Sequence, residues 1–339
     1  MSSAQNKKNH SSARNDLIWR LDDEFPSHEI EQRLLGERGY SDFMVSRSAT
    51  YKEDYVKYAP YAKGISVAVS FPLKAEDIKG LTSCKIICVT GGGYNHVDIE
   101  AATQRGIIVT YIPGYCVEEV SDHAMGFILA LNQRFPVGQN MTRRGLWKAT
   151  DIGPFRRLKG QVLGLVGFGR IGKAIARKAK CLGLQVKVFD PYISDSEMRE
   201  VGAESVKFDE LVRISDFISL HVLLTKETRH MMNAKVFDAM KKTAYLINTC
   251  RGEVVDELAL INALNVKKIA GAGLDVLAKE PPDPQNPLLN MPNVIATPHS
   301  AYFSEEARME NKVRSIKAIT DVIEGRIPED IVNPQVLNR

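Results

Sequence analysis

The sequence predicts an α/β protein made of two doubly wound domains, each a parallel sheet covered by helices. A chain of 339 residues is longer than one hydrophobic core usually serves, which indicates two domains. Short runs of β-branched and other apolar residues alternate with helical segments along the chain. One of these runs leads directly into a G-x-G-x-x-G motif at Gly167, Gly169 and Gly172. Strands that alternate with helices in this way form open parallel sheets.

The composition excludes several classes of partner. The chain has 45 basic and 41 acidic residues, a net charge of +4, so we expect no nucleic-acid partner. The longest apolar run, Ala124–Leu131, is too short to cross a bilayer, and no membrane partner is expected. Residues 1–15 are polar and lack an apolar segment of the signal-peptide type, which predicts a disordered tail.

The cysteines indicate a reducing compartment. There are five, an odd number, and most stand inside apolar runs, as expected of reduced thiols in a cytoplasmic protein. Cys84 and Cys88 are four apart in a strand-like run and share a face, so core packing is favoured over metal binding. We predict no metal site.

The first part of the chain predicts a small parallel sheet. Ser27 can cap a helix that includes Ile30 and Leu34. The expected strands are Leu17–Leu21, Gly64–Val69, Cys84–Val89 and Gly106–Thr110.

A glycine-rich stretch, Gly91-Gly92-Gly93, follows the third of these strands. Three glycines can let backbone N–H groups converge on a small anion. They can equally form a flexible turn, and the stretch alone does not decide between the two.

Helical spacing of apolar residues predicts a long helix from Val117 to about Gln133, which we expect to bridge the two domains. His123 on this helix is interpreted as a packed or capping histidine rather than a ligand.

The region from Val162 to Asp190 predicts a dinucleotide-binding unit. A buried strand, Val162–Val166, precedes the glycine motif. Gly167 permits a tight turn, Gly169 lets the backbone approach a pyrophosphate, and Gly172 allows close helix packing. Arg170 and Ile171 lie in the turn at the start of a helix, whose N–H groups and dipole favour phosphate.

A second strand, Val186–Asp190, ends in a carboxylate. An acid about twenty residues past the glycines accepts hydrogen bonds from the ribose hydroxyls and repels a 2′-phosphate. Asp190 therefore predicts NAD rather than NADP as the cofactor.

Alternation of strands and helices continues to the end of the chain. A last helix, Ser304 to about Glu324, is expected to pack on the first domain. The expected strands are Asp216–His221, Ala244–Asn248, Ile269–Asp275 and Val294–Ala296, with helices at 236–240 and Glu257–Leu264 between them.

Three polar residues each follow a separate predicted strand: Arg251, Glu280 and His299. The carboxyl ends of parallel strands meet at one edge of a sheet, so these side chains can converge. A guanidinium can hold a carboxylate and polarise the adjacent carbonyl. A histidine can exchange a proton with the carbonyl oxygen, and a neighbouring carboxylate orients it and favours its protonated form. Each residue alone also suits a salt bridge, a surface loop or a turn.

The motifs VGFGRIG, LINTCRG, GAGLDVLAKEPP and TPHSA, over roughly Trp19 to Pro334, resemble the D-isomer-specific 2-hydroxyacid dehydrogenases. This resemblance implies catalytic roles for Arg251, Glu280 and His299, and a cofactor site that includes Thr249 and Asp275, the latter contacting the nicotinamide carboxamide. It also implies that Gly92 and Gly93 bind the substrate carboxylate through their backbone. The implied reaction is reversible transfer of a hydride between NADH and a small 2-keto acid.

The same resemblance implies a Rossmann-like cofactor domain, residues 113–300, inserted into a discontinuous substrate domain of residues 16–112 and 301–339. Members of the family are usually dimers, so a homodimer is expected.

Two segments, PGYCVEEVSDHAMG and HSAYFSEEA, are most similar to the branch that holds the C-terminal-binding-protein corepressors and related dehydrogenases. An NAD-sensing scaffold is therefore an alternative to an enzyme, although this chain lacks the long tails of such scaffolds. A formate dehydrogenase is disfavoured by Glu280, where glutamine is expected. The chain departs from the family pattern at Leu223, Cys250 and Asn95, where proline, serine or alanine, and aspartate are common.

Overall fold

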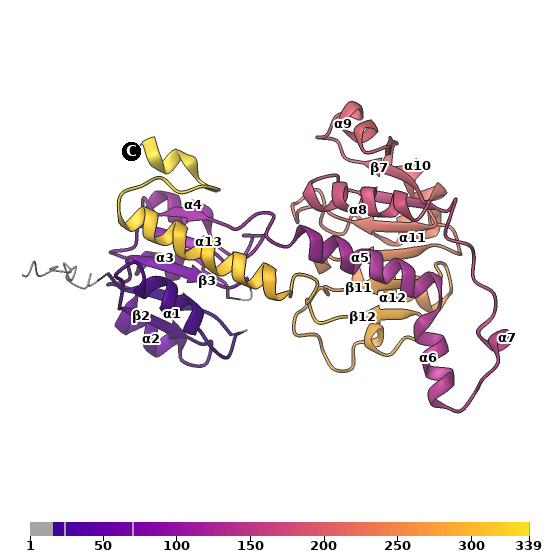
Figure 1. Ribbon diagram of the computed structural model, residues 1–339, viewed down its shortest axis with the longest axis horizontal. Coiled ribbons are helices and arrows are strands. Elements are labelled where there is room, and N and C mark those ends of the chain that lie inside the picture. Colours follow the sequence, from indigo (N-terminus) through magenta and orange to yellow (C-terminus); the bar gives the residue numbers. More distant parts are fainter. Residues whose placement is uncertain (1–15, 24, 70, 339) are drawn as a thin grey trace, which may run out of the picture. The chain divides into compact units, whose positions relative to one another are not determined.

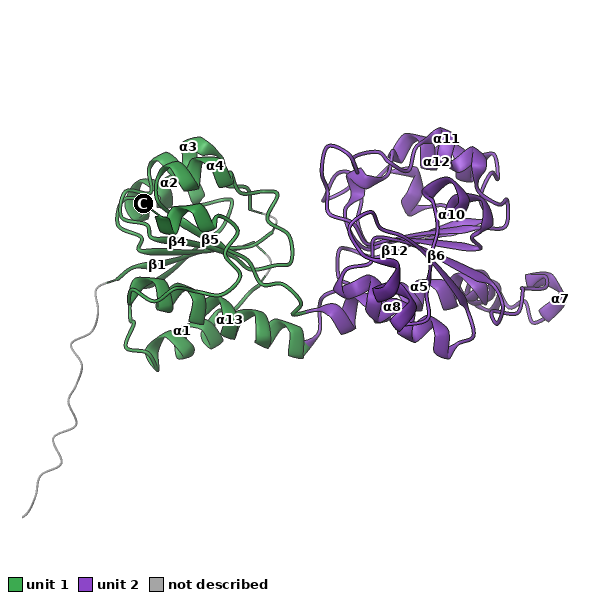
Figure 2. Cartoon of the chain, turned by 90° about the horizontal axis from the view of Figure 1, so that it is seen from above, with its two compact units in different colours: residues 1–115, 305–339 green, residues 116–304 purple. Residues whose placement is uncertain are grey.

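The computed structural model describes residues 16–23, 25–69 and 71–338, and the chain divides into two compact units (Figure 2). Unit 1 comprises residues 1–115 and 305–339, and unit 2 comprises residues 116–304. The predicted tail at residues 1–15 lies outside the described residues. Unit 2 is thus inserted into a unit built from two separate stretches of chain, and the predicted fold class is confirmed.

Unit 1 is built on a five-stranded parallel sheet with the order β2-β1-β3-β4-β5 (Figure 1). The inner strands are buried on both faces, which explains why their sequences are almost continuously apolar. The strands are β1 (Ile18–Leu21), β2 (Phe43–Ser46), β3 (Gly64–Val67), β4 (Ile86–Val89) and β5 (Ile108–Thr110).

Helices cover both faces of this sheet. Figure 2 shows α1 and α13 on one face and α2, α3 and α4 on the other. A Cβ on Gly64 would lie 2.6 Å from Ile319 Cγ2, so the last helix packs directly on β3, as the sequence predicts. The helices are α1 (Glu29–Gly36), α2 (Tyr51–Tyr58), α3 (Ala75–Lys79), α4 (Ile99–Gln104) and α13 (Glu305–Ile323), with a 3₁₀ turn at Pro334–Asn338.

Unit 2 contains a seven-stranded parallel sheet with the order β12-β11-β10-β9-β6-β7-β8. The strand order reverses between β6 and β9, and ligands of such sheets bind at the carboxyl ends of the strands beside this point. The strands are β6 (Val162–Val166), β7 (Gln185–Phe189), β8 (Glu204–Ser205), β9 (Phe217–Leu220), β10 (Tyr245–Asn248), β11 (Gly271–Leu274) and β12 (Val294–Ala296).

Two hydrophobic cores flank the sheet of unit 2. One packs α5 and α8 against the sheet around Phe127, Phe168 and Ile175, and the other packs α10, α11 and α12 around Phe237 and Leu260. The helices are α5 (Val117–Asn132), α6 (Phe135–Arg143), α7 (Ala149–Ile152), α8 (Arg170–Cys181), α9 (Asp195–Glu200), α10 (Phe208–Ile214), α11 (Ala234–Ala239) and α12 (Glu257–Asn265), with 3₁₀ turns at Gly252–Val254 and Pro287–Leu289.

Several features differ from the sequence analysis, among them the N-cap of α1, which is His28 rather than Ser27. Strand β2 was not expected, because its apolar run, Phe43–Val45, is only three residues long and is shorter than the runs that indicate a strand. The long helix α5 was expected to bridge the domains but lies wholly within unit 2. Among the described residues, none of the helices has the length and apolar character needed to cross a membrane.

Candidate active site

The glycine motif lies at the reversal point of the unit 2 sheet, directly after β6. Gly167 has a φ of +96°, and a Cβ there would lie 2.3 Å from the carbonyl oxygen of His221 after β9. A Cβ on Gly172 would lie 2.5 Å from Gly167 O. Both positions therefore require glycine for close packing.

Gly169, in contrast, borders open space. It is the N-cap of α8, it is exposed, and nothing lies within 4 Å of the position of a Cβ. Arg170 is exposed at the first turn of the helix and Ile171 is half-buried beside the core. The free N–H groups of the helix N-terminus face this space, which suits a pyrophosphate.

Asp190 joins the end of β7 to the glycine motif. Its Oδ2 accepts a hydrogen bond from Phe168 N at 2.7 Å, and its Oδ1 accepts one from Tyr192 N at 2.9 Å. Backbone N–H groups thus hold the carboxylate in one orientation beside the turn. The arrangement leaves lone pairs on both oxygens for the hydroxyls of a ribose.

Residues 221–223 follow β9 at the same edge of the sheet as the glycine motif. His221 Nε2 lies 2.7 Å from Ser219 Oγ, and burial lowers the pKa of His221 to about 3, so the ring is neutral at pH 7. Leu223, which replaces the proline common in the family, is 65% exposed, and its carbonyl accepts a hydrogen bond from Thr228 Oγ1 at 2.6 Å. A side-chain hydrogen bond therefore supports the chain at this position.

Arg251 follows β10, and hydrogen bonds with neighbouring residues hold both its backbone and its side chain. Asn248 Nδ2 donates to Arg251 O at 2.9 Å, and the Arg251 guanidinium donates to Cys250 O at 2.6 Å. A Cβ on Gly252 would lie 2.0 Å from Leu277 C and O, so this loop packs closely on the loop that leads to Glu280. Cys250 Sγ donates to Asn248 Oδ1 at 3.1 Å.

Thr249 has a buried Oγ1 with no hydrogen-bond partner in the described part of the chain. A buried hydroxyl left without a partner is costly. Its position at the end of β10, beside Arg251, suits a contact to a bound molecule.

Glu280 and His299 form a close pair at the ends of β11 and β12. His299 Nδ1 lies 2.6 Å from Glu280 Oε2, and Leu277 N donates to Glu280 Oε1 at 3.0 Å. Burial alone would raise the pKa of Glu280, but the hydrogen bond and charge of His299, with a contribution from Arg251, lower it below the ordinary value. The ionised carboxylate accepts Nδ1–H and leaves Nε2 as the ring nitrogen that can face a substrate.

Asp275 is buried and holds the loop that carries His299. Its side chain is 1% exposed. Its Oδ1 accepts from Thr297 Oγ1 at 2.6 Å and from Ser300 N at 2.9 Å, and its Oδ2 accepts from Ala301 N at 3.0 Å. The Asp275 carboxylate is therefore hydrogen-bonded to other residues of the protein. Its contact to the nicotinamide carboxamide stays a prediction.

His123 on α5 joins the same cluster and was not among the site residues that the sequence predicts. Its Nε2 lies 2.9 Å from Thr297 Oγ1, and its ring meets that of Phe127 edge-on with centroids 4.6 Å apart. His123 is packed, as the sequence analysis expects. The polar partner of His123 is Thr297, two residues before His299.

Gly92 and Gly93 belong to unit 1, in a bend that follows β4. Gly92 is exposed, with nothing within 4 Å of the position of a Cβ, whereas a Cβ on Gly91 would lie 2.3 Å from Val69 Cγ2. None of the three glycines has a positive φ, so the alternating backbone of an anion nest is not formed here. Binding of a carboxylate by Gly92 and Gly93 stays a prediction.

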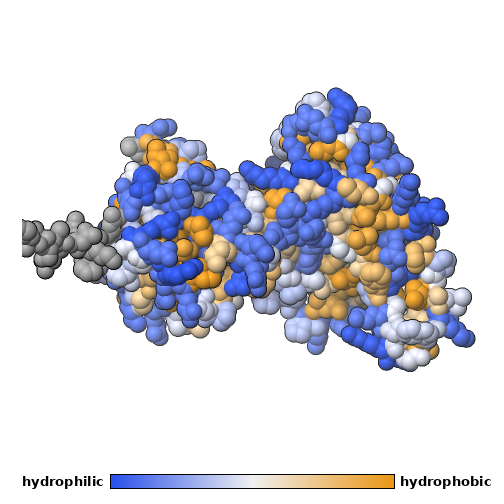
Figure 3. Space-filling model, in the orientation of Figure 1, coloured by the Kyte–Doolittle hydropathy of each residue, from blue (hydrophilic) through white to orange (hydrophobic). Residues whose placement is uncertain are grey.

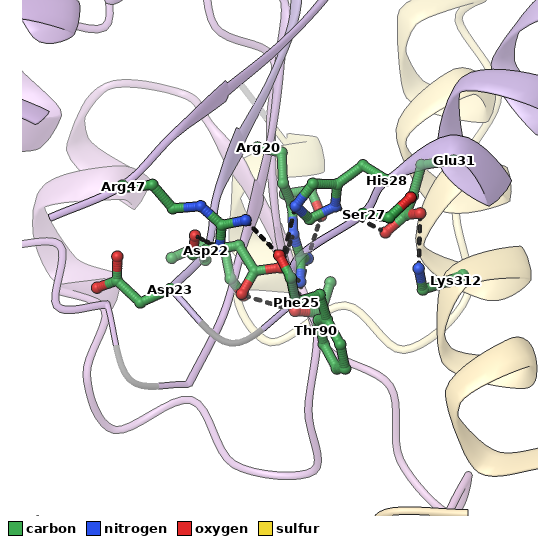
Figure 4. A network of polar contacts seen from close by, with 12 residues as sticks. Arg20, Asp22, Asp23, Phe25, Ser27, His28, Glu31, Arg47, Thr90 and Lys312 are labelled. Atoms are coloured by element: carbon green, nitrogen blue, oxygen red, sulfur yellow. Dashed lines mark hydrogen bonds and ion pairs between the residues drawn. The ribbon is translucent and has the colours of Figure 1, made fainter. Parts of the chain in front are cut away.

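A buried cluster of charges includes Arg20 and contacts Thr90, the residue before this bend (Figure 4). Arg20, 4% exposed, donates to Thr90 Oγ1 and to Ser66 Oγ at 2.8 Å and pairs with Asp22 at 3.0 Å. Thr90 immediately precedes Gly91. Arg20 thus connects the start of the glycine bend to strands β1 and β3.

Comparisons with known proteins show the family to which the chain is related. Residues 125–301 match the family model of the D-isomer specific 2-hydroxyacid dehydrogenase, NAD binding domain. A glyoxylate reductase of Korarchaeum cryptofilum is 39% identical over 320 residues, which cover 92% of this chain and 96% of that protein. A glyoxylate reductase of Thermococcus litoralis is 42% identical over 268 residues, covering 77% and 81%.

A solved structure shows the same fold. The crystal structure of D-lactate dehydrogenase from Aquifex aeolicus, complexed with NAD and lactic acid, superposes with a TM-score of 0.84. It is 30% identical in sequence, and the match covers 93% of this chain and 98% of that chain.

The chain belongs to the D-isomer-specific 2-hydroxyacid dehydrogenase family. It is an oxidoreductase that acts on the CH–OH group of 2-hydroxy acids, and its cofactor is NAD. The open space beside Gly169 at the start of α8 and the buried Thr249 hydroxyl, which has no hydrogen-bond partner in the described part of the chain, fit such a dinucleotide.

Proposed function

We propose that this protein reduces a small 2-keto acid to the D-2-hydroxy acid with NADH, and that it catalyses the reverse oxidation with NAD. The observation that carries the proposal is the 2.6 Å contact between His299 Nδ1 and Glu280 Oε2. A histidine oriented by an ionised carboxylate is what proton exchange with a carbonyl oxygen requires. Both relatives described above are glyoxylate reductases, which supports a small substrate.

In the proposed cofactor site, the backbone at Gly167, Gly169 and Gly172, with Arg170 and Ile171, holds the pyrophosphate at the start of α8. Asp190 accepts hydrogen bonds from the ribose and disfavours a 2′-phosphate. Thr249 and Asp275 complete the site near the nicotinamide. When bound, NADH supplies the hydride that reduces the substrate carbonyl.

The chain supplies substrate binding and the proton. Arg251 holds the substrate carboxylate and polarises the neighbouring carbonyl, with the backbone of Gly92 and Gly93 as a second support for the carboxylate. His299 donates the proton on Nε2 to the carbonyl oxygen. Glu280 accepts the Nδ1–H of His299 throughout, so the ring keeps one orientation while its charge changes.

The stereochemistry of oxidation tests this assignment. The protein would be supplied with NAD and the D or L form of a small 2-hydroxy acid such as glycerate or lactate, and NADH formation followed by absorbance. We expect NADH from the D form only. Equal rates with both forms, or a preference for the L form, would contradict the proposal.

We also propose that the protein is a homodimer. The α6–α7 segment of unit 2, residues 135–152, exposes several large apolar side chains, and a few orange atoms stand among white and blue ones at α6 in Figure 3. Trp147 is 87% exposed, Phe135 62% and Leu146 44%. Exposed apolar side chains gathered in one segment are typical of a protein interface.

The cytoplasmic location stays a proposal based on the cysteines. Cys88 lies buried in β4, and burial raises the pKa of its thiol to about 11, so the thiol is retained as an inert apolar group.

A further inference from the structure

The backbone that presents His299 is strained. His299 has a φ of +50°, a left-handed conformation that is unfavourable for a residue with a β-carbon. Its N–H donates to Asp275 O at 2.8 Å, and the Asp275 carboxylate accepts hydrogen bonds from residues on both sides of it. The orientation of the histidine therefore depends on how firmly Asp275 and Thr297 are held.

The direction of the hydrogen bonds can be worked out. Thr297 has one hydroxyl proton. A carboxylate can only accept hydrogen bonds, so the Thr297 hydroxyl donates this proton in its 2.6 Å hydrogen bond to Asp275 Oδ1. The oxygen of Thr297 must then accept from His123 Nε2, 2.9 Å away. His123 thus carries a proton on Nε2, and the chain of donors runs from His123 through Thr297 to Asp275.

Packing holds the His123 ring in place for this bond. Phe127 lies one turn further along α5 and meets the ring edge-on. A Cβ on Gly273 in β11 would lie 2.6 Å from Phe127 Cγ, so the absence of a side chain there lets α5 approach the strand. This approach sets His123 beside Asp275, with Nε2 3.7 Å from Oδ1.

We propose that His123 is a positioning residue for catalysis, acting through Thr297 and Asp275 on the loop that carries His299. The inference rests on the proposed function, since it assumes that His299 transfers the proton. His123 is 174 residues from Thr297 in the sequence and contributes the only side chain of α5 with a hydrogen bond to Thr297 within the described residues. Loss of its N–H leaves Thr297 Oγ1 without that donor and loosens the loop.

Two variants separate the hydrogen bond from the packing. His123→Phe keeps an aromatic ring against Phe127 but has no N–H. His123→Gln has an amide N–H of similar reach and can donate to Thr297. Asp122→Ala is the matched control on the same helix, since Asp122 is exposed and pairs with Lys178 on α8.

We expect His123→Phe to lower kcat by about tenfold or more, because even a small displacement of a catalytic group lowers the rate of the chemical step. KM and the Kd for NADH should stay within about threefold of wild type. His123→Gln should restore kcat to within about threefold. Asp122→Ala should match wild type. An unchanged kcat in His123→Phe, or a loss that His123→Gln does not rescue, would overturn the proposal.

A second measurement does not depend on turnover. Hydrogen exchange of the peptide that contains Ser300 and Ala301, whose N–H groups bond to Asp275, reports how firmly the loop is held. We expect exchange about tenfold faster in His123→Phe and near wild type in His123→Gln. Wild-type exchange in His123→Phe would overturn the proposal even if the proposed reaction were correct, and absence of wild-type turnover would count against the reaction alone.

Discussion

Glu280 and His299 follow neighbouring strands of unit 2 and meet with 2.6 Å between Oε2 and Nδ1. The pair gives the carboxylate its lowered pKa and fixes which ring nitrogen of the histidine remains for chemistry. Arg251, at the end of the next strand, contributes to the same electrostatic environment.

Replacing the proton donor tests its role. His299→Ala should lower kcat by at least about a hundredfold, the usual contribution of general acid–base catalysis, because no group remains to protonate the carbonyl oxygen. The Kd for NADH, measured by fluorescence, and the melting temperature should stay near wild type. A turnover equal to that of wild type would rule out His299 as the proton donor.

The orienting carboxylate has a smaller expected effect. Because the pKa of Glu280 is lowered, the carboxylate stays ionised at neutral pH and loses its charge only as the pH falls below the ordinary range of a glutamate. Glu280→Gln should therefore reduce kcat by about tenfold or more at pH 7. Lys279→Ala, an exposed neighbour on the same loop, is the control and should keep wild-type kinetics.

Cofactor choice depends on Asp190. Asp190→Ala removes the acceptor that is held by Phe168 N and Tyr192 N, and with it the negative charge that repels a 2′-phosphate. We expect the Kd for NADH to rise about tenfold and the preference over NADPH to shrink. Asp195→Ala, exposed at the start of α9, is the control. An unchanged Kd for NADH in Asp190→Ala would disprove the assignment.

The stability of unit 1 should depend on pH through Glu31 (Figure 4). Burial would raise the pKa of Glu31, but hydrogen bonds from His28 and Lys312 and the charge of Lys312, 2.7 Å away, lower it from 4.5 to about 2. An acidic group whose pKa is lower in the folded than in the unfolded state contributes its full stabilisation to folding when the pH is above its unfolded-state pKa. Its contribution, up to about 3 kcal/mol, is lost as the pH falls from about 4.5 to about 2.

Acid unfolding followed by circular dichroism checks this contribution. Glu31→Gln should flatten the pH dependence of unfolding over that interval, whereas Glu29→Gln, exposed on the same helix, should leave it unchanged. Identical acid transitions for wild type and Glu31→Gln would show that the buried pair does not control acid stability.

The proposed dimer makes a prediction about α6 and α7. Trp147→Glu places a charge on the most exposed large apolar residue of this segment and should shift the mass measured by analytical ultracentrifugation from dimer to monomer. Val56→Glu, at a 75% exposed site on α2, should not change the mass. A wild-type monomer would refute the dimer directly.

The sequence could predict the candidate site residues because these residues follow strands. The run before Gly167 is the largely buried strand β6, and the polar residues at 251, 280 and 299 follow β10, β11 and β12, whose carboxyl ends the parallel sheet brings to one edge. The roles of Gly167 in the tight turn and of Gly172 in the close packing of α8 have a direct physical basis in the 2.3 Å and 2.5 Å approaches at their Cβ positions.

Contacts between distant residues could not be predicted in this way. His123 carries the signature of a packed helix residue, and only the fold brings it to Thr297. The pairing of Glu31 with Lys312 joins residues 281 positions apart, and neither has a local motif. Strand β2 was not predicted because its apolar run is short, and only its parallel pairing with β1 in the fold defines it as a strand.

The most direct test of the central claim is reduction of a panel of 2-keto acids, including glyoxylate, hydroxypyruvate and pyruvate, with NADH consumption followed by absorbance. Wild type and His299→Ala would be assayed side by side, and each reaction repeated with NADPH. We predict turnover of at least one member by wild type with NADH, slower turnover with NADPH, and a loss of about a hundredfold or more in His299→Ala. Tight NADH binding without turnover of any keto acid would contradict the account and favour an NAD-binding scaffold.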